Sequence, residues 1–136
     1  MIKKVLIICI ILISGCTKEG KHIEYYDNGS IKEIGFYKEW KRDSVWTYWY
    51  ENGNMDSKIS WRNGKLNGTI SHWHENGVKS DSGFYKGGEE HGQYLQWHKN
   101  GKQSMVLLYD NGIEQERECY DEKGIECECD DFWGCK

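Results

Sequence analysis

The sequence predicts an all-β fold, an elongated single antiparallel sheet built from successive β-hairpins. Three observations predict it. The pentapeptides YYDNG, WYENG, WHENG and WHKNG recur with a 24-residue period, beginning at Tyr25, Trp49, Trp73 and Trp97. Each contains Asn-Gly flanked by β-favouring residues, the strongest short-range sign of a hairpin. The chain also has 16 glycines, which permit tight turns, and no proline, which would interrupt strand ladders.

Each 24-residue unit is expected to contain two turns and two strands of about six to eight residues. The first turn is the Asn-Gly at 28–29, 52–53, 76–77 and 100–101, which we expect to be a two-residue type I′ hairpin with positive φ at both residues. A second turn position follows eleven residues later, at Trp40, Gly64, Gly88 and Gly112, with a further one four residues on, at Ser44, Gly68, Gly92 and Glu116. The middle units match best, as expected for an array with capping units at both ends.

Two sets of aromatic residues recur at this period. Because each unit contributes two strands, equivalent side chains of neighbouring units should lie about 10 Å apart on one face of the sheet. One such ladder is Trp49, Trp73 and Trp97, and the other is Tyr37, Trp61, Tyr85 and Tyr109. Which ladder is buried stays open, since a single bulge would exchange the two faces. The ladders are either structural packing throughout or, for one of them, an exposed binding surface.

The hairpins and the connections GKLNG (64–68) and GGEEHG (87–92) resemble the MORN repeat, in the variant form common in bacterial exported proteins. The resemblance covers residues 23–119. It implies an elongated, twisted antiparallel sheet that serves as a scaffold, a dimerisation surface or a lipid contact, and some bacterial members carry an antitoxin label. Departures occur in the first unit, at Trp40 and Ser44, and in the fourth, at Glu116 and Glu118.

The first 15 residues have the layout of an export signal. Residues 1–4 include two lysines, 5–13 are all apolar, and the small residues 14–15 precede Cys16. The apolar run is shorter than the about 20 residues that span a bilayer. Residues 13–16 resemble the lipobox of bacterial lipoproteins, which implies that Cys16 is the lipid attachment site and carries acyl chains such as palmitate. The alternative is an ordinary secretory signal followed by an incidental cysteine.

These segments divide the chain into four parts. We expect a signal peptide at 1–15, a tether at 16–22, the repeat array at 23–119 and an acidic, cysteine-rich cap at 120–136. The mature protein is then expected in the bacterial cell envelope, anchored to a membrane and facing the periplasm or the exterior. Whether that membrane is the inner or the outer one stays open.

Four of the six cysteines fall in the last eighteen residues, at Cys119, Cys127, Cys129 and Cys135. In an exported protein they suggest two disulfides. A bond between Cys127 and Cys129 is discounted because residues two apart on an extended strand strain the bridge. Cys119 then pairs with either of these two, and Cys135 with the other. The alternative is a Cys₄ zinc site, which the C-x-C spacing disfavours.

No catalytic constellation is recognisable in the sequence, so we expect no enzyme, no cofactor and no metal. His72 and His74 form an H-x-H pair on an expected strand, but the spacing provides no third metal ligand, and we interpret them as surface histidines. The formal net charge is −4, and basic residues are scattered among acids, which argues against nucleic acid as a partner.

The sequence therefore predicts a noncatalytic, membrane-anchored repeat lipoprotein that acts as a protein–protein interaction scaffold. Its partners would be the membrane, through the acyl chains, and another protein or its own copy. One alternative is a carbohydrate or peptidoglycan binder that stacks sugar rings on Trp49, Trp73 and Trp97. Another is an antitoxin-like immunity protein.

Overall fold

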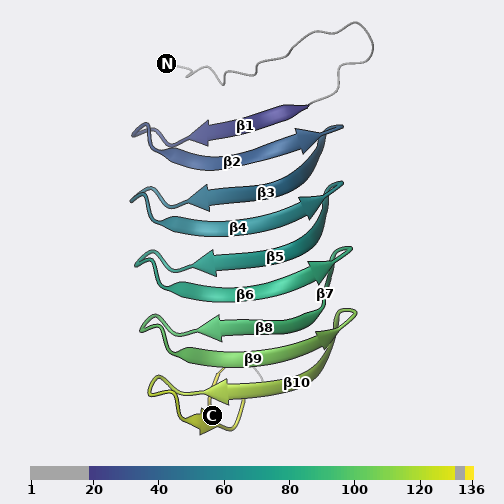
Figure 1. The fold of residues 1–136 in the computed structure, drawn as a ribbon. Helices are drawn as coiled ribbons and strands as arrows, with labels where there is room; N and C mark the ends of the chain where they lie inside the picture. Colours follow the sequence, from purple (N-terminus) through teal and green to yellow (C-terminus); the bar gives the residue numbers. More distant parts are fainter. Residues whose placement is uncertain (1–18, 131–133) are drawn as a thin grey trace, which may run out of the picture.

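A computed structural model describes residues 19–130 and 134–136. These residues form one open antiparallel sheet of 11 strands that follow one another in hairpin order, with β7 pairing only with β6 (Figure 1). The strands are β1 (Gly20–Tyr25), β2 (Ile31–Lys38), β3 (Lys41–Trp49), β4 (Met55–Arg62), β5 (Lys65–Trp73), β6 (Lys79–Lys86), β7 (Glu89–Glu90), β8 (Gly92–Trp97), β9 (Gln103–Asp110), β10 (Ile113–Tyr120) and β11 (Glu126–Cys127). The predicted all-β hairpin array is confirmed.

The sheet starts earlier than the expected boundary at residue 23. β1 begins at Gly20, which pairs with Tyr37 on β2. Because β2 is eight residues long, its far end needs a partner, and three residues assigned to the tether provide it. The rest of the tether and the signal peptide lie outside the described residues, as does Cys16.

The Asn-Gly corners reverse the chain as predicted, but the predicted turn type is wrong. The amide of Gly29 donates to the carbonyl of Tyr26 (3.0 Å), and the amide of Tyr26 donates to the carbonyl of Ser30 (2.9 Å), which closes a three-residue loop. Gly29 has φ 88°, whereas Asn28 is not among the residues with positive φ. This is a type I turn followed by a left-handed glycine. The Asn28 side chain reinforces it by accepting from the Ser30 amide at 2.8 Å.

The two-residue turns with positive φ at both central residues occur at the other ends of the strands, away from these Asn-Gly corners. Asn63-Gly64, Gly87-Gly88 and Asn111-Gly112 form three of them. The fourth is Glu39-Trp40, where φ is 49° and 64° without any glycine. A residue other than glycine with positive φ lowers the stability of the fold by on the order of 1 kcal/mol. The pairing of β2 with β3 is nevertheless kept on both sides of the turn.

The two aromatic ladders lie on opposite faces, because side chains alternate along a strand and register partners share a face. We call one side the core face. It carries all the buried hydrophobic side chains of the described residues, namely Trp46, Ile70, Met105, Leu107 and Cys119. We call the other side the tryptophan face, since it carries Trp49, Trp73 and Trp97. The ladder of Tyr37, Trp61, Tyr85 and Tyr109 lies on the core face.

Glycines on the core face make room for large rings on the next strand. A Cβ built on Gly35 would fall inside the indole of Trp46, and one built on Gly83 would fall inside the ring of Tyr94. In the unit between them the glycine position is taken by Ile59, whose partner is the smaller Ile70. Large and small residues therefore alternate along this row to fill a similar volume in each unit.

Neighbouring units are also joined by side chains at the turns. The hydroxyls of Tyr26 and Tyr50 donate to the backbone carbonyls 23 residues further on, Trp49 and Trp73, each at 2.6 Å. The later units use an imidazole instead, and His98 Nε2 lies 2.8 Å from the carbonyl of Tyr120. These contacts repeat with the array, so stability is spread over nearest-neighbour interfaces.

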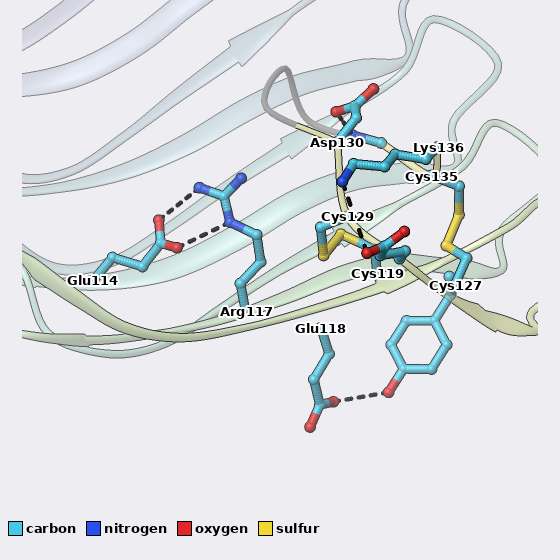
Figure 2. Close-up of a disulfide and its surroundings, with 12 residues drawn as sticks. Glu114, Arg117, Glu118, Cys119, Cys127, Cys129, Asp130, Cys135 and Lys136 are labelled. Carbon is cyan, nitrogen blue, oxygen red and sulfur yellow. Dashed lines mark hydrogen bonds and ion pairs between the residues drawn. A yellow bond between two sulfur atoms is a disulfide. The ribbon is translucent and has the colours of Figure 1, made fainter.

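After β10 come a fifth turn of the three-residue kind and a disulfide-bonded tail, whose two bridges Figure 2 shows. Gly124 donates to the carbonyl of Asp121 at 2.8 Å, the same arrangement as in the Asn-Gly turns. Disulfides then join Cys119 to Cys129 and Cys127 to Cys135, with Cα separations of 5.4 and 5.6 Å. This is one of the two connectivities left open by the sequence. Met105 and Leu107 pack beneath these sulfur atoms, so the tail covers the core face at this end.

Candidate functional site

The tryptophan ladder stands at equivalent places in three strands. Trp49, Trp73 and Trp97 are the last residues of β3, β5 and β8, just before each Asn-Gly turn, and all three are half-buried. Lys79 Nζ lies 5.7 Å from the ring of Trp73 and 5.4 Å from that of Trp97. One ammonium group thus bridges two indoles by cation–π contacts. The partly exposed rings leave a surface on which flat or apolar groups can pack.

Exposed apolar side chains extend this surface. Phe36, Val45 and Phe84 lie on the tryptophan face and are 41%, 53% and 45% exposed. Phe36 and Phe84 are two repeat units apart, so they recur along the array. Apolar residues recurring on one uncovered face are typical of an interaction surface.

The core face holds a small pocket at the second aromatic ladder. Tyr85, Glu90, Tyr94, Gln96 and Tyr109 line an open hollow of about 230 Å³. The Tyr85 hydroxyl donates to Glu90 Oε1 at 2.9 Å. Burial, together with this carboxylate, raises the pKa of Tyr85 well above its ordinary value, so the phenol stays protonated. The hollow is smaller than the roughly 300–1,000 Å³ usual for cofactor and substrate sites.

A polar network lies next to the pocket. His72 Nδ1 is 2.6 Å from Asp81 Oδ1, and the Tyr94 hydroxyl donates to the same oxygen at 3.0 Å. The hydrogen bond to Asp81 raises the pKa of His72. Burial alone would raise the pKa of Asp81, but the hydrogen bonds from His72, Ser80 and Tyr94 outweigh it and lower that pKa. The pair is therefore a partly buried ion pair at mildly acidic pH.

Ser57, His72 and Asp81 stand side by side on three neighbouring strands, in the order of a serine hydrolase triad. A triad needs a hydrogen bond from the serine to the imidazole and an accessible hydroxyl. Within the described part of the chain no side-chain hydrogen bond joins the Ser57 hydroxyl to His72, and Ser57 is only 5% exposed. The row therefore has the residue types of a triad without its connections.

The other histidines of the middle units serve the fold. His74 Nε2 lies 3.3 Å from the carbonyl of Trp97, in the place of the tyrosine hydroxyls of the earlier units. His72 and His74 thus have separate partners, Asp81 and a backbone carbonyl, and do not converge on one point. Both were predicted from the sequence to be surface histidines, whereas the structure shows them partly buried and each with a specific partner.

One cluster of polar residues was missed by the sequence reasoning. Three potential metal-ligand atoms lie within 4.8 Å of one another, one each from His22 and Glu24 on β1 and from Glu33 on β2. The signal was present as H-x-E followed by a glutamate nine residues later, across the first hairpin. It becomes meaningful only with the strand register, which sets Glu24 opposite Glu33.

The comparisons agree with this architecture. A family model described as "MORN repeat variant" matches residues 18–39 and 42–63, the first two units. No curated protein matches the chain. No helix within residues 19–130 or 134–136 is long and apolar enough to cross a membrane. Repeats of this family are generally protein- or membrane-interaction modules, and the family is noncatalytic. The matched segments are thus MORN repeats of the variant form, and the same hairpin recurs through the rest of the sheet.

Proposed function

We propose that this protein is a noncatalytic interaction scaffold of the bacterial envelope, held on a membrane by acyl chains on Cys16. The observation that carries the proposal is the tryptophan face, which the described residues leave uncovered and where Trp49, Trp73 and Trp97 share one side of the sheet with the exposed Phe36 and Phe84. A partner protein or a second copy of the chain would pack against this face. The small pocket and the unconnected Ser57–His72–Asp81 row support a noncatalytic role.

Lipid attachment is tested by metabolic labelling with radioactive palmitate. We expect label on the full-length chain and none on the Cys16→Ala variant. Unlabelled protein with Cys16 intact would refute the anchor. The interaction face could still be tested in that case with the soluble chain.

The face is tested by photo-crosslinking from single sites in cells. A crosslinking residue at Phe84 should capture one defined protein, while the same residue at Asn111, an exposed turn position, should not. Trp73→Ala should weaken binding to that protein by more than about 1 kcal/mol, as central aromatic anchors do. Identical crosslinks from both positions would contradict a specific surface.

The second candidate function is carbohydrate binding on the same ladder. The cation–π contacts of Lys79 with Trp73 and Trp97 favour it, because they hold two indoles in a defined arrangement and place a donor beside them. Sugars stack on such rings and bond to such donors. Tryptophan fluorescence titrated with peptidoglycan fragments should change if this is so, and a flat response excludes it.

A further inference from the structure

His22, Glu24 and Glu33 combine one imidazole and two carboxylates at the first edge of the sheet. On the core face His22 and Glu24 are two residues apart on β1, and Glu33 is the direct cross-strand partner of Glu24. The partner of His22 is Gly35, which has no side chain and leaves the imidazole free to lean toward Glu33. His22 Nε2 lies 2.8 Å from Glu33 Oε1. Three donor atoms thus converge from two neighbouring strands.

The charges in this cluster are unusual for the array. Like charges directly opposite each other destabilise a strand pair. The equivalent facing pairs in the next three units are Tyr48 with Ser57, His72 with Asp81, and Gln96 with Met105. Only the first of these four pairs sets two carboxylates against each other. A cation between them would turn this repulsion into a bond across the hairpin.

The imidazole is held in place by its neighbours. The His22 ring stacks on Trp46 with centroids 5.5 Å apart and meets the edge of Tyr37 at 5.6 Å. The side chains of His22 and Glu33 are 20% and 12% exposed, while that of Glu24 is 43% exposed. Two donors are therefore fixed and partly desolvated, and the third is open to solvent, from which an ion can arrive. Lys32 Nζ, 2.9 Å from Glu24 Oε1, is the competing cation.

We propose that His22, Glu24 and Glu33 form a binding site for a divalent transition metal, with Zn²⁺ as the representative ion. One imidazole nitrogen with two carboxylate oxygens suits such a metal, whereas Mg²⁺ and Ca²⁺ prefer oxygen donors alone. The metal ties the edge strand β1 to β2. It thereby does for the N-terminal edge of the sheet what the two disulfides do for the C-terminal edge. The site is independent of the proposed partner-binding face.

The test is calorimetric titration of the untagged chain, from residue 17 onward, with ZnCl₂ at pH 7. We expect one site in the wild-type chain and at least tenfold weaker binding in His22→Ala and in Glu33→Gln, which keeps the shape of the side chain. His72→Ala is the matched control, since His72 faces a single carboxylate and should leave the affinity unchanged. Lys32→Ala should strengthen binding, because it removes the competitor for Glu24.

Hydrogen exchange gives a second readout that locates the ion. Zn²⁺ should slow amide exchange in β1 of the wild-type chain and leave it unchanged in His22→Ala, with circular dichroism confirming that both are folded. Equal Zn²⁺ affinity of the wild type, His22→Ala and Glu33→Gln would overturn the proposal. So would protection that appears in the tail and not in β1.

Discussion

The packing of Trp46 over Gly35 leads to a sharp prediction about stability. Trp46 is fully buried, although the sheet is a single layer, because its indole lies flat over the backbone of Gly35. It also meets the edge of Tyr37 at 4.8 Å and lies beneath the guanidinium of Arg42 at 4.5 Å. Its Nε1 donates to the carbonyl of Phe36 at 3.2 Å. A methyl group at residue 35 cannot be accommodated unless the indole moves.

Gly35→Ala should therefore lower the free energy of unfolding by about 2–4 kcal/mol. The lower figure is the usual cost of overpacking, and the upper figure approaches the loss of a buried tryptophan. Gly35 does not have positive φ, so this loss is steric. Gly53→Ala is the control, because Gly53 has φ 87° with no atom near its Cβ position, and its cost of about 1 kcal/mol is conformational.

The pair Ile59 and Ile70 in the next unit supplies the decisive variant. Gly35→Ile and Trp46→Ile should each be destabilising alone, while the double variant should recover more than about 1 kcal/mol of their summed cost, since coupled neighbours are not additive. Urea unfolding of the four proteins, followed by far-ultraviolet circular dichroism, measures this coupling. Strict additivity would refute the idea that ring and glycine fill one shared volume.

Three further predictions concern the tail, the turns and the core face. Cys127→Ala with Cys135→Ala opens a short loop, of separation 8, and should cost about 2–3 kcal/mol in urea unfolding by the loop-entropy relation. Tyr50→Phe removes the 2.6 Å hydrogen bond to the next unit and should cost about 1 kcal/mol, while an unchanged urea midpoint would mean that water replaces it. Because the pKa of His72 is higher in the folded chain than its unfolded value of 6.5, protonated His72 stabilises the fold fully below pH 6.5. This contribution is lost as the pH rises through the folded-state pKa. Because the pKa of Asp81 is lower in the folded chain than its unfolded value of 3.8, ionised Asp81 stabilises the fold fully above pH 3.8. This contribution is lost as the pH falls through the folded-state pKa, so the His72–Asp81 pair contributes most between pH 3.8 and 6.5. Asp81→Asn should flatten that part of the stability profile measured by thermal unfolding.

The sequence predicts the hairpin order because turns and strands repeat at a fixed interval, but it does not predict the turn geometry. The same dipeptide, Asn-Gly, makes a three-residue loop at 28–29 and a two-residue type I′ turn at 63–64. Loop length is fixed by which flanking residues pair, and the dipeptide alone carries no such information. At Glu39-Trp40 only the repeat period marks the turn, because neither residue type favours positive φ and the strands on either side impose these values.

The faces could be predicted only in part. Alternation places each ladder on one face of the sheet. Register shifts nevertheless occur in seven of the ten strand pairs, for example between Tyr48 and Trp49, and each shift can exchange the faces. The buried position of Trp46 gave no signal of its own, because it depends on Gly35, eleven residues away across a hairpin. The convergence of His22 with Glu33 spans the same interval and was missed for the same reason.

A single-layer array has a weakness at its two ends that bears on where this protein works. Apart from the two-residue β7, each inner strand is held by two neighbours, but β1 and β11 have one each, and unpaired edges fray first. At the C-terminal edge, Met105 and Leu107 are covered by Tyr94, by Tyr109 and by a tail that two disulfides close. In a reducing compartment that tail would loosen and expose an apolar core next to an open edge, which favours aggregation. The tail therefore supports the proposed location outside the cytoplasm independently of the leader. Dithiothreitol should then increase proteolysis near residues 119–136 while leaving the middle units intact, whereas uniform digestion along the array would contradict a local role for the bridges.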